Sequence, residues 1–191
     1  YGWWVCGIRW ARSVRPAFIA STGLRGATSA AASRKACGSA KPSVYSTITS
    51  VIVGDGANLN MVSIQDWDDE AVHLGRDSIR VGRDASVRHT AVSFGGDLVR
   101  VHTNVEYAGP GGSAELLGLY FADEGQHIEH RLFVDHNAPR TQSNVVYKGA
   151  LQGEGAHSVW IGNVLIRKVA EGIETYEENR NLILSDGAQA D

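Results

Sequence analysis

Cysteine is nearly absent from this 191-residue sequence, and its two occurrences, Cys6 and Cys37, lie in the N-terminal quarter. The rest of the chain therefore has no disulfide framework, which small secreted domains commonly need. The two cysteines also lack the C-x-x-C spacing that is typical of zinc sites. We expect a chain that folds without disulfides, in a cytoplasmic setting.

Long apolar runs are missing as well. No stretch approaches the ~20 apolar residues that a membrane-spanning helix needs, so we expect no membrane partner. The spacing of apolar residues that marks an amphipathic helix is absent almost everywhere. The sequence also contains no Walker A motif, so we expect no ATP hydrolysis by this chain itself.

Acidic residues are absent from the first 48 positions, which hold seven Lys or Arg, whereas the remainder holds 11 basic and 21 acidic residues. An acidic body argues against nucleic acid as a partner, because phosphate binding needs a basic surface. Residues 21–40 are mostly Ala, Ser, Gly and basic residues, which bury little apolar surface. We interpret residues 1–43 as a disordered or non-native leader. An organelle transit peptide and a basic tail for an acidic partner are the alternatives.

From about residue 44 onward, strand signals dominate. Over residues 99–107, apolar or β-branched residues at odd positions alternate with polar residues at even positions. This period of two predicts a strand with one buried and one wet face. In residues 127–135, Ile128, His130, Leu132 and Val134 fall on one face in the same way. The Glu-rich segment 171–178 is also better read as strand, because β-branched and aromatic residues accompany its glutamates.

A turn rich in Gly, Asp and Glu precedes an apolar strand five times, and each turn ends in a small residue. These small residues are Ala57, Ala85, Gly112, Ala156 and Ala188, with spacings of 28, 27, 44 and 32. A unit of turn plus strand at such a period, with no helix, predicts a β-helix. The six-residue type of β-helix is excluded, because the aliphatic–Gly pairs between residues 53 and 162 hold no six-residue phase.

Seven short sequences occur in order along residues 44–191. They are VSIQDW (62–67), GGDLVR (95–100), YAGPGG (107–112), AELLGLYF (114–121), HRLFVDH (130–136), SNVVYKG (143–149) and NRNLILS (179–185). Together they resemble the SufB/SufD family of iron–sulfur cluster assembly proteins, and the SufD branch and actinobacterial members above all. Residues 1–43 show no such resemblance.

The resemblance implies an all-β fold, a right-handed parallel β-helix over residues 44–191. It also implies a non-catalytic scaffold subunit that pairs with a SufB-like subunit and a SufC-like ATPase in a complex that builds and transfers iron–sulfur clusters. Family members continue past the position of Asp191, so we expect a fragment truncated at its C-terminal end. Their candidate cluster ligands and ATPase-docking surface lie in that later part. We therefore assign no catalytic, cofactor-binding or metal residue here, and we expect an iron–sulfur cluster only in the full complex.

Five side chains of metal-binding type lie close together in the sequence: His127, Glu129, His130, Asp135 and His136. Histidine and carboxylate groups bind zinc or iron. On a strand, however, His127 and His130 point to opposite faces. Asp135 can share a face with His127 and Glu129, but it lies roughly 20 Å from Glu129 along a strand that rises ~3.3 Å per residue. We interpret the five as solvent-facing strand and corner residues.

A second function class rests on the acidic run Asp66, Asp68, Asp69 and Glu70. Such a run suggests a calcium site or the paired carboxylates of a secreted, carbohydrate-binding or polysaccharide-cleaving β-helix. We interpret it as a solvated acidic face, and we keep that class only as the alternative function.

Two weaker signals remain. The Gly-x-Gly turns at 54–56, 109–111 and 153–155 lack the third glycine and the following helix of a phosphate-binding loop. Lys148 lies between an aromatic residue and a glycine, and we interpret it as a corner residue. Because open terminal coils of solenoids expose apolar core and strand edges, we also expect this chain to self-associate.

Overall fold

The computed structural model describes residues 17–21, 27–33 and 43–191, and all regular structure in these residues is β-strand. The strands are β1 (Ala17–Ser21), β2 (Ala27–Ser33), β3 (Ser43–Val53), β4 (Asn58–Trp67), β5 (Ala71–Val81), β6 (Ser86–Gly95), β7 (Leu98–Tyr107), β8 (Ser113–Ala122), β9 (His127–His136), β10 (Gln142–Leu151), β11 (His157–Ile166), β12 (Glu174–Ile183) and β13 (Gln189–Ala190). No helix in the described part of the chain is long and apolar enough to cross a membrane.

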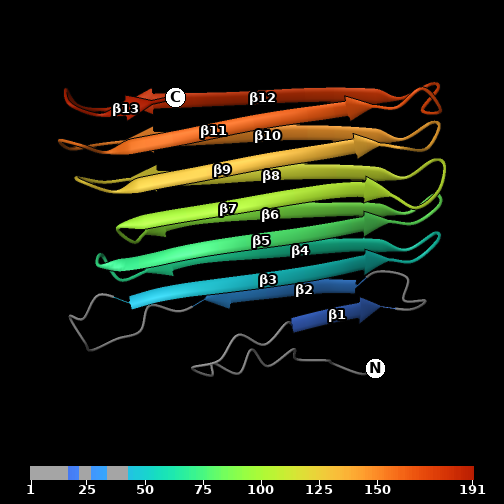
Figure 1. The fold of residues 1–191 in the computed structure, drawn as a ribbon, viewed down its shortest axis with the longest axis horizontal. Coiled ribbons are helices and arrows are strands. Elements are labelled where there is room, and N and C mark those ends of the chain that lie inside the picture. The colour runs from blue at the N-terminus through green and yellow to red at the C-terminus, as the bar shows by residue number, and fades with distance from the viewer. Residues whose placement is uncertain (1–16, 22–26, 34–42) are drawn as a thin grey trace.

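The strands form two parallel sheets that the chain visits in turn (Figure 1). The odd-numbered strands, in chain order, make sheet A, and the even-numbered strands make sheet B. Each strand pairs in parallel with the strand two places along: Ser86 of β6, for example, is the register partner of Asn58 in β4 and of Ser113 in β8. One strand from each sheet therefore makes one coil. The predicted all-β parallel β-helix is confirmed.

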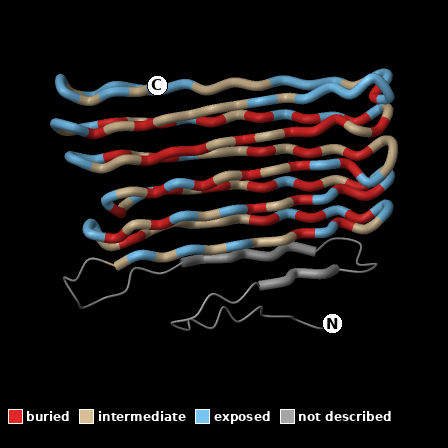
Figure 2. The backbone as a smooth tube through the Cα atoms, viewed as in Figure 1, coloured by how far each residue is buried: buried red, intermediate tan, exposed pale blue. Residues whose placement is uncertain are grey.

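The core lies between the two sheets and consists of alternate residues of every inner strand (Figure 2). The alternation predicted for residues 99–107 is confirmed, because the odd positions of β7 are buried and the even positions face outward. Val99, Val105 and Tyr107 are almost completely inaccessible to solvent. Of the segment predicted as strand over 171–178, residues 174–178 lie in β12, whereas residues 171–173 belong to the preceding turn.

The recurrent turns work through a residue with positive φ followed by a small buried residue. Gly56 has φ +67°, Asp84 has φ +50° and Gly155 has φ +72°. The next residue in each case is a buried alanine, and its amide closes the turn: for instance, the Ala57 amide donates to the Gly54 carbonyl at 3.0 Å. A small side chain is needed there because this position lies inside the corner of the coil.

The irregular spacing of 44 between Gly112 and Ala156 has a topological cause. Gly112 precedes a strand of sheet B, whereas Ala156 precedes a strand of sheet A, so the interval spans one and a half coils. The next corner that leads into sheet B lies at residues 138–141, and the sequence pattern misses it. There Arg140 adopts φ +53° and Thr141 is the buried residue, a combination that carries no Gly signal.

The leader expected over residues 1–43 lies mostly outside the described residues, including Cys6 and Cys37. Two strands do lie within it, since β1 pairs with β3 and β2 pairs with β4. The domain boundary at residue 43 stays a prediction, as does self-association. Apolar side chains do reach solvent on the last coil, where Leu182, Ile183 and Leu184 are each about half exposed.

Candidate functional site

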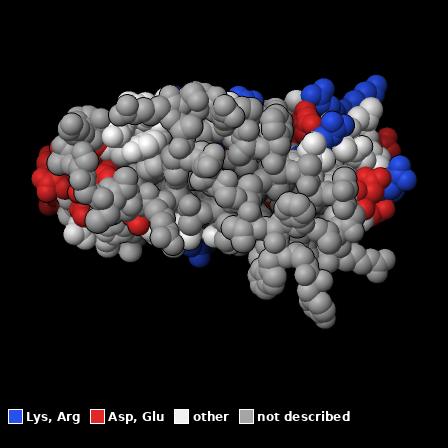
Figure 3. All heavy atoms as spheres, turned by 90° about the horizontal axis from the view of Figure 1, so that it is seen from below, with Lys and Arg blue, Asp and Glu red and all other residues white. Residues whose placement is uncertain are grey.

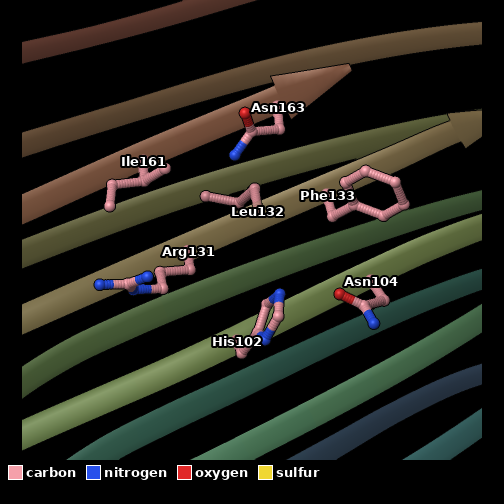
Figure 4. A pocket seen from close by; sticks show the side chains of 7 residues that line it. All are labelled: His102, Asn104, Arg131, Leu132, Phe133, Ile161 and Asn163. Atoms are coloured by element: carbon pink, nitrogen blue, oxygen red, sulfur yellow. The ribbon is translucent and has the colours of Figure 1, made fainter. Parts of the chain in front are cut away.

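The outer face of sheet A carries a shallow groove of about 290 Å³ across β7, β9 and β11 (Figure 4). Two register rows form it, because parallel pairing stacks equivalent positions of successive coils. The first row is His102, Arg131 and Ile161, and the second is Asn104, Phe133 and Asn163. The groove therefore offers an aromatic ring flanked by two amides, and a guanidinium group beside an imidazole.

A second groove of about 410 Å³ shares Asn104 and Phe133 with the first and continues toward the N-terminal coils. Arg76, Ser78 and Arg80 of β5 line it there. Both grooves open widely to solvent. Their amides, hydroxyls and guanidinium groups are suited to hydrogen bonding with a docked chain, and they enclose no reaction chamber of the kind that excludes water.

His102 stands among positive charges in the first groove. Its partial burial, and then the charges of Arg76, Arg131 and Arg100, lower the pKa of the imidazole. The ring therefore stays neutral near pH 7 and can both donate and accept a hydrogen bond.

Glu129 is the acidic counterpart of these arginines on the same face. Arg131 bonds to its carboxylate, Arg100 lies 3.4 Å away and His127 lies 3.6 Å away. Burial acts to raise the pKa of Glu129, but the hydrogen bond from Arg131 and the charges of both arginines outweigh it, so the pKa falls. Glu129 is thus an ionised group held by its neighbours.

The interpretation of the five metal-type residues as solvent-facing is wrong for four of them, because Glu129 and Asp135, on the outer side of β9, are buried, as are two of the histidines. His130 and His136 point into the solenoid with the apolar residues of β9 and are buried. His136 lies within hydrogen-bonding distance of the Thr141 hydroxyl at 2.7 Å and the Ser143 hydroxyl at 3.0 Å. These hydroxyls belong to the next half-coil, so no pattern within residues 127–136 indicates them.

His130 lies between two tyrosine rings of sheet B. Its ring centre is 5.4 Å from that of Tyr120 and 5.3 Å from that of Tyr147. Burial lowers the pKa of His130 to about 4, and the charge of nearby His89 acts in the same direction. A neutral imidazole packed between aromatic rings is a core residue, closed to any substrate in solution.

Asp135 and His127 lie at opposite ends of β9 and do not meet. Asp135 pairs with Arg167 at the turn after β11, with Oδ2 2.7 Å from Nη2 and Oδ1 2.8 Å from Nε. That bidentate hydrogen bond is the main reason why the pKa of Asp135 is lowered. Across residues 17–21, 27–33 and 43–191, no three or more His, Cys, Asp or Glu side chains converge to hold a metal ion.

Two further histidines, His73 and His89, are buried, although the sequence patterns do not single them out. The Thr47 hydroxyl lies 2.9 Å from Nε2 of His73, and the Ser63 hydroxyl lies 3.0 Å from Nε2 of His89. Burial lowers the pKa of His73 to about 4. His89 faces buried Asp77: burial lowers the pKa of the imidazole and raises that of the carboxyl group, while the attraction between them opposes both shifts.

The acidic run lies at one end of the solenoid, where β4 ends and β5 begins. Asp68, Asp69 and Glu70 make that turn, and Asp66 is the penultimate residue of β4. They belong to a larger feature that we call the acidic edge: the five turns from sheet B to sheet A within residues 43–191, at residues 68–70, 96–97, 123–126, 152–156 and 184–188. These turns contain eight Asp or Glu and no Lys or Arg.

On the face shown in Figure 3, Asp and Glu alone mark one end of the solenoid, whereas both signs of charge mark the other. The solvated acidic face inferred from the sequence is therefore present and extends over successive coils. An edge of this charge repels phosphate groups.

Lys148 is exposed, but it lies in the middle of β10 and faces outward, so its interpretation as a corner residue is wrong. The glycines at 56, 111 and 155 provide positive φ at turns. They lead into strands, as the sequence indicates, and a phosphate-binding loop needs a helix at that point.

The chain matches a known protein family and several proteins of similar sequence. The family model of the SUF system FeS cluster assembly SufBD core domain matches residues 26–191. This match begins earlier than the resemblance seen from residue 44. Iron–sulfur cluster assembly SufBD family proteins of Mycobacterium bovis and Mycobacterium tuberculosis are each 54% identical over 153 residues, which is 77% of this chain and 38% of theirs.

A SufBD family protein of Mycobacterium leprae is 52% identical over the same length, and a second one from that organism is 29% identical over 130 residues. The chain spans about two fifths of the length of these 52–54% identical relatives. With a core-domain match over most of its residues, and a β-solenoid that the sequence already indicated, the chain belongs to the SufBD family of iron–sulfur cluster assembly proteins.

Proposed function

We propose that this chain is the core of a non-catalytic scaffold subunit on which iron–sulfur clusters are assembled. The observation that carries the proposal is the match of residues 26–191 to the SufBD core domain, together with relatives named for cluster assembly. In this proposal the cluster is cargo, and its ligands come from the full complex. The subunit acts in the cytoplasm and plays the role of the SufD branch.

The architecture supports a scaffold because each coil is tied to the next by continuous parallel pairing and by ion pairs across the outer faces. Arg88 pairs with Glu115 between β6 and β8, and Arg80 pairs with Glu106 at 3.6 Å between β5 and β7. Such a rod holds surfaces in constant relation to one another. The buried histidines, meanwhile, are used for packing.

The proposed partners are a SufB-like subunit and a SufC-like ATPase, and ATP hydrolysis belongs to the latter. The two grooves on the outer face of sheet A support docking, since they present amides, guanidinium groups and Phe133 on a rigid sheet. The acidic edge supports a protein partner over nucleic acid.

A chimera tests the proposal. This chain would replace the matching segment of the 54% identical Mycobacterium tuberculosis relative, so that the solenoid is studied at the relative's full length. We expect the tagged chimera to recover the SufB-like and SufC-like proteins of that organism as well as the unmodified relative does. Loss of both partners from a folded chimera would contradict the scaffold role. ATP hydrolysis by the purified chimera without partners would contradict the non-catalytic assignment.

A further inference from the structure

Two histidines of neighbouring coils face each other on the outer side of sheet A. His127 and His157 are the first residues of β9 and β11, and they are register partners. Their Nδ1 atoms lie 3.1 Å apart, and the rings meet at 78°. The side chains are 28% and 33% exposed, so water reaches the pair.

The other nitrogen of each ring faces a carboxylate. Nε2 of His157 lies 2.8 Å from Oδ2 of Asp191, and Nε2 of His127 lies 3.6 Å from Oε2 of Glu129. An ionised carboxylate only accepts hydrogen bonds, so His157 presents its N–H to Asp191 at Nε2. A neutral imidazole carries one N–H, so Nδ1 of His157 has a lone pair and accepts a hydrogen bond from Nδ1–H of His127.

If the shared proton leaves and His127 carries its N–H at Nε2, toward Glu129, both Nδ1 lone pairs become available to one metal ion. A transition metal ion fits the spacing. With metal–nitrogen distances of ~2.0–2.1 Å, two imidazole nitrogens lie about 2.9 Å apart at adjacent corners of a square plane and about 3.4 Å apart in a tetrahedron. The observed 3.1 Å lies between these values.

The surroundings favour such an ion in two ways. A carboxylate that bonds to the outer nitrogen of a ligating histidine orients the ring and makes it a better ligand. Asp191 is well placed for this role, because its backbone pairs with Ser158 and Trp160 of β11.

The charge of the site is also suitable for a cation. Both histidines directly follow turns of the acidic edge, at residues 123–126 and 152–156, and those turns add three carboxylates and no cationic side chain. Arg100 and Arg131 are the nearby positive groups, and both are engaged with Glu129.

We propose that His127 and His157 form a binding site for a divalent first-row transition ion, of the kind that imidazole prefers, such as Zn²⁺ or Cu²⁺. Because no third His, Cys, Asp or Glu of the described chain joins the pair, water completes the coordination. An ion held by two protein ligands exchanges readily and remains open to an external ligand. This site stands apart from the scaffold function, because it requires no partner.

The test uses the full 191-residue chain carrying Cys6→Ser and Cys37→Ser, which removes thiol ligands. Zn²⁺ is titrated by calorimetry at pH 8, where protons compete least. We expect one equivalent to bind. His157→Asn and His127→Asn should each weaken binding at least tenfold, and Asp191→Asn should weaken it about tenfold, since it leaves both ligands in place.

His102→Asn is the matched control, because His102 is the remaining histidine on the outer face and its neighbours are arginines. It should leave zinc affinity unchanged. Four of the seven histidines are buried and do not compete. With Cu²⁺, electron paramagnetic resonance should show coupling to two nitrogens in the parent and to one in either pair variant.

Folding of each variant is checked by circular dichroism, and Asp191→Asn keeps the test informative if a pair variant fails to fold. Zinc should also raise the melting temperature of the parent by mass action and leave that of His157→Asn unchanged. The proposal is overturned if the parent binds no zinc. It is overturned equally if the pair variants and Asp191→Asn bind zinc as the parent does, or if His102→Asn weakens binding as much as they do.

Discussion

The ring of Tyr147 lies directly over the backbone of Gly118, its register partner in the preceding coil. The arrangement is repeated one step along the same sheet, where the ring of Tyr120 lies over Gly149. Each tyrosine is almost completely buried and contacts His130 from sheet A. The glycines therefore provide the room that these rings need, since a parallel sheet stacks identical positions only about 4.8 Å apart.

Substitution of Gly118 by alanine should destabilise the fold by about 1–3 kcal/mol, because the new Cβ would overlap the ring of Tyr147. Chemical denaturation with urea measures this change. Leu119→Ala is the control: Leu119 adjoins Gly118, faces outward and is 54% exposed, so its loss should change stability by no more than about 0.5 kcal/mol. If Gly118→Ala were as mild as the control, the packing of Tyr147 over Gly118 would be wrong.

Gly56→Ala tests the energetic cost of a left-handed backbone conformation without a steric clash. A Cβ at Gly56 would meet no atom within 4 Å, but the residue has φ +67°. The left-handed conformation costs a non-glycine residue about 1–2 kcal/mol, so we expect a loss of about 1 kcal/mol in urea denaturation. Gly125→Ala, with φ +71° and equally open surroundings, should lose the same amount. Unequal losses would show that contacts, and not backbone conformation, decide the effect.

The sequence predicts the architecture well because the physical signals of a solenoid are local. A period of two in residues 99–107 depends only on neighbours along one strand. Turn residues with positive φ are indicated by Gly, as at Gly56 and Gly155. The corner at Arg140 escapes detection because an arginine adopts the left-handed conformation there, which propensity alone disfavours.

The candidate site is less predictable because its contacts join different coils. His89, for example, has its hydrogen-bond partner Ser63 in the preceding coil, 26 positions earlier in the sequence. His127 and His157, likewise, meet only because the intervening coil has 30 residues. The exact length of each coil decides such pairings, and the composition of a turn does not specify it.

The buried histidines should make stability fall as the pH drops from about 6.5 to 4. His73 and His130 have ordinary pKa values near 6.5 when unfolded and about 4 when folded. In this window the unfolded chain binds protons that the folded chain excludes, so each histidine contributes stability above pH 6.5 that is lost on acidification. Each loss is on the order of 3 kcal/mol when complete. Asp77 titrates in the opposite sense, since its pKa is raised by burial.

Urea denaturation at pH 7.0, 5.5 and 4.5 measures the slope. His130→Gln should lower stability at pH 7 and flatten the profile, because the group that resists protonation is gone. A second variant, His73→Gln, should flatten it independently, as the two histidines lie in strands that are not adjacent. A flat profile in the parent, or an unchanged slope in both variants, would contradict the assignment of neutral core histidines.

Tyr107→Phe tests a hydrogen bond that joins the two sheets across the core. The Tyr107 hydroxyl donates to the carbonyl of Gln142, the first residue of β10, at 2.6 Å. Its removal leaves that carbonyl without this donor at a site where the tyrosine is buried, so we expect a loss of about 1 kcal/mol in urea denaturation. Tyr176→Phe is the matched control, because its hydroxyl bonds to Glu178 in an exposed position and water replaces the partner. Equal effects of the two substitutions would mean that the bond between the sheets adds nothing beyond what a surface hydroxyl provides.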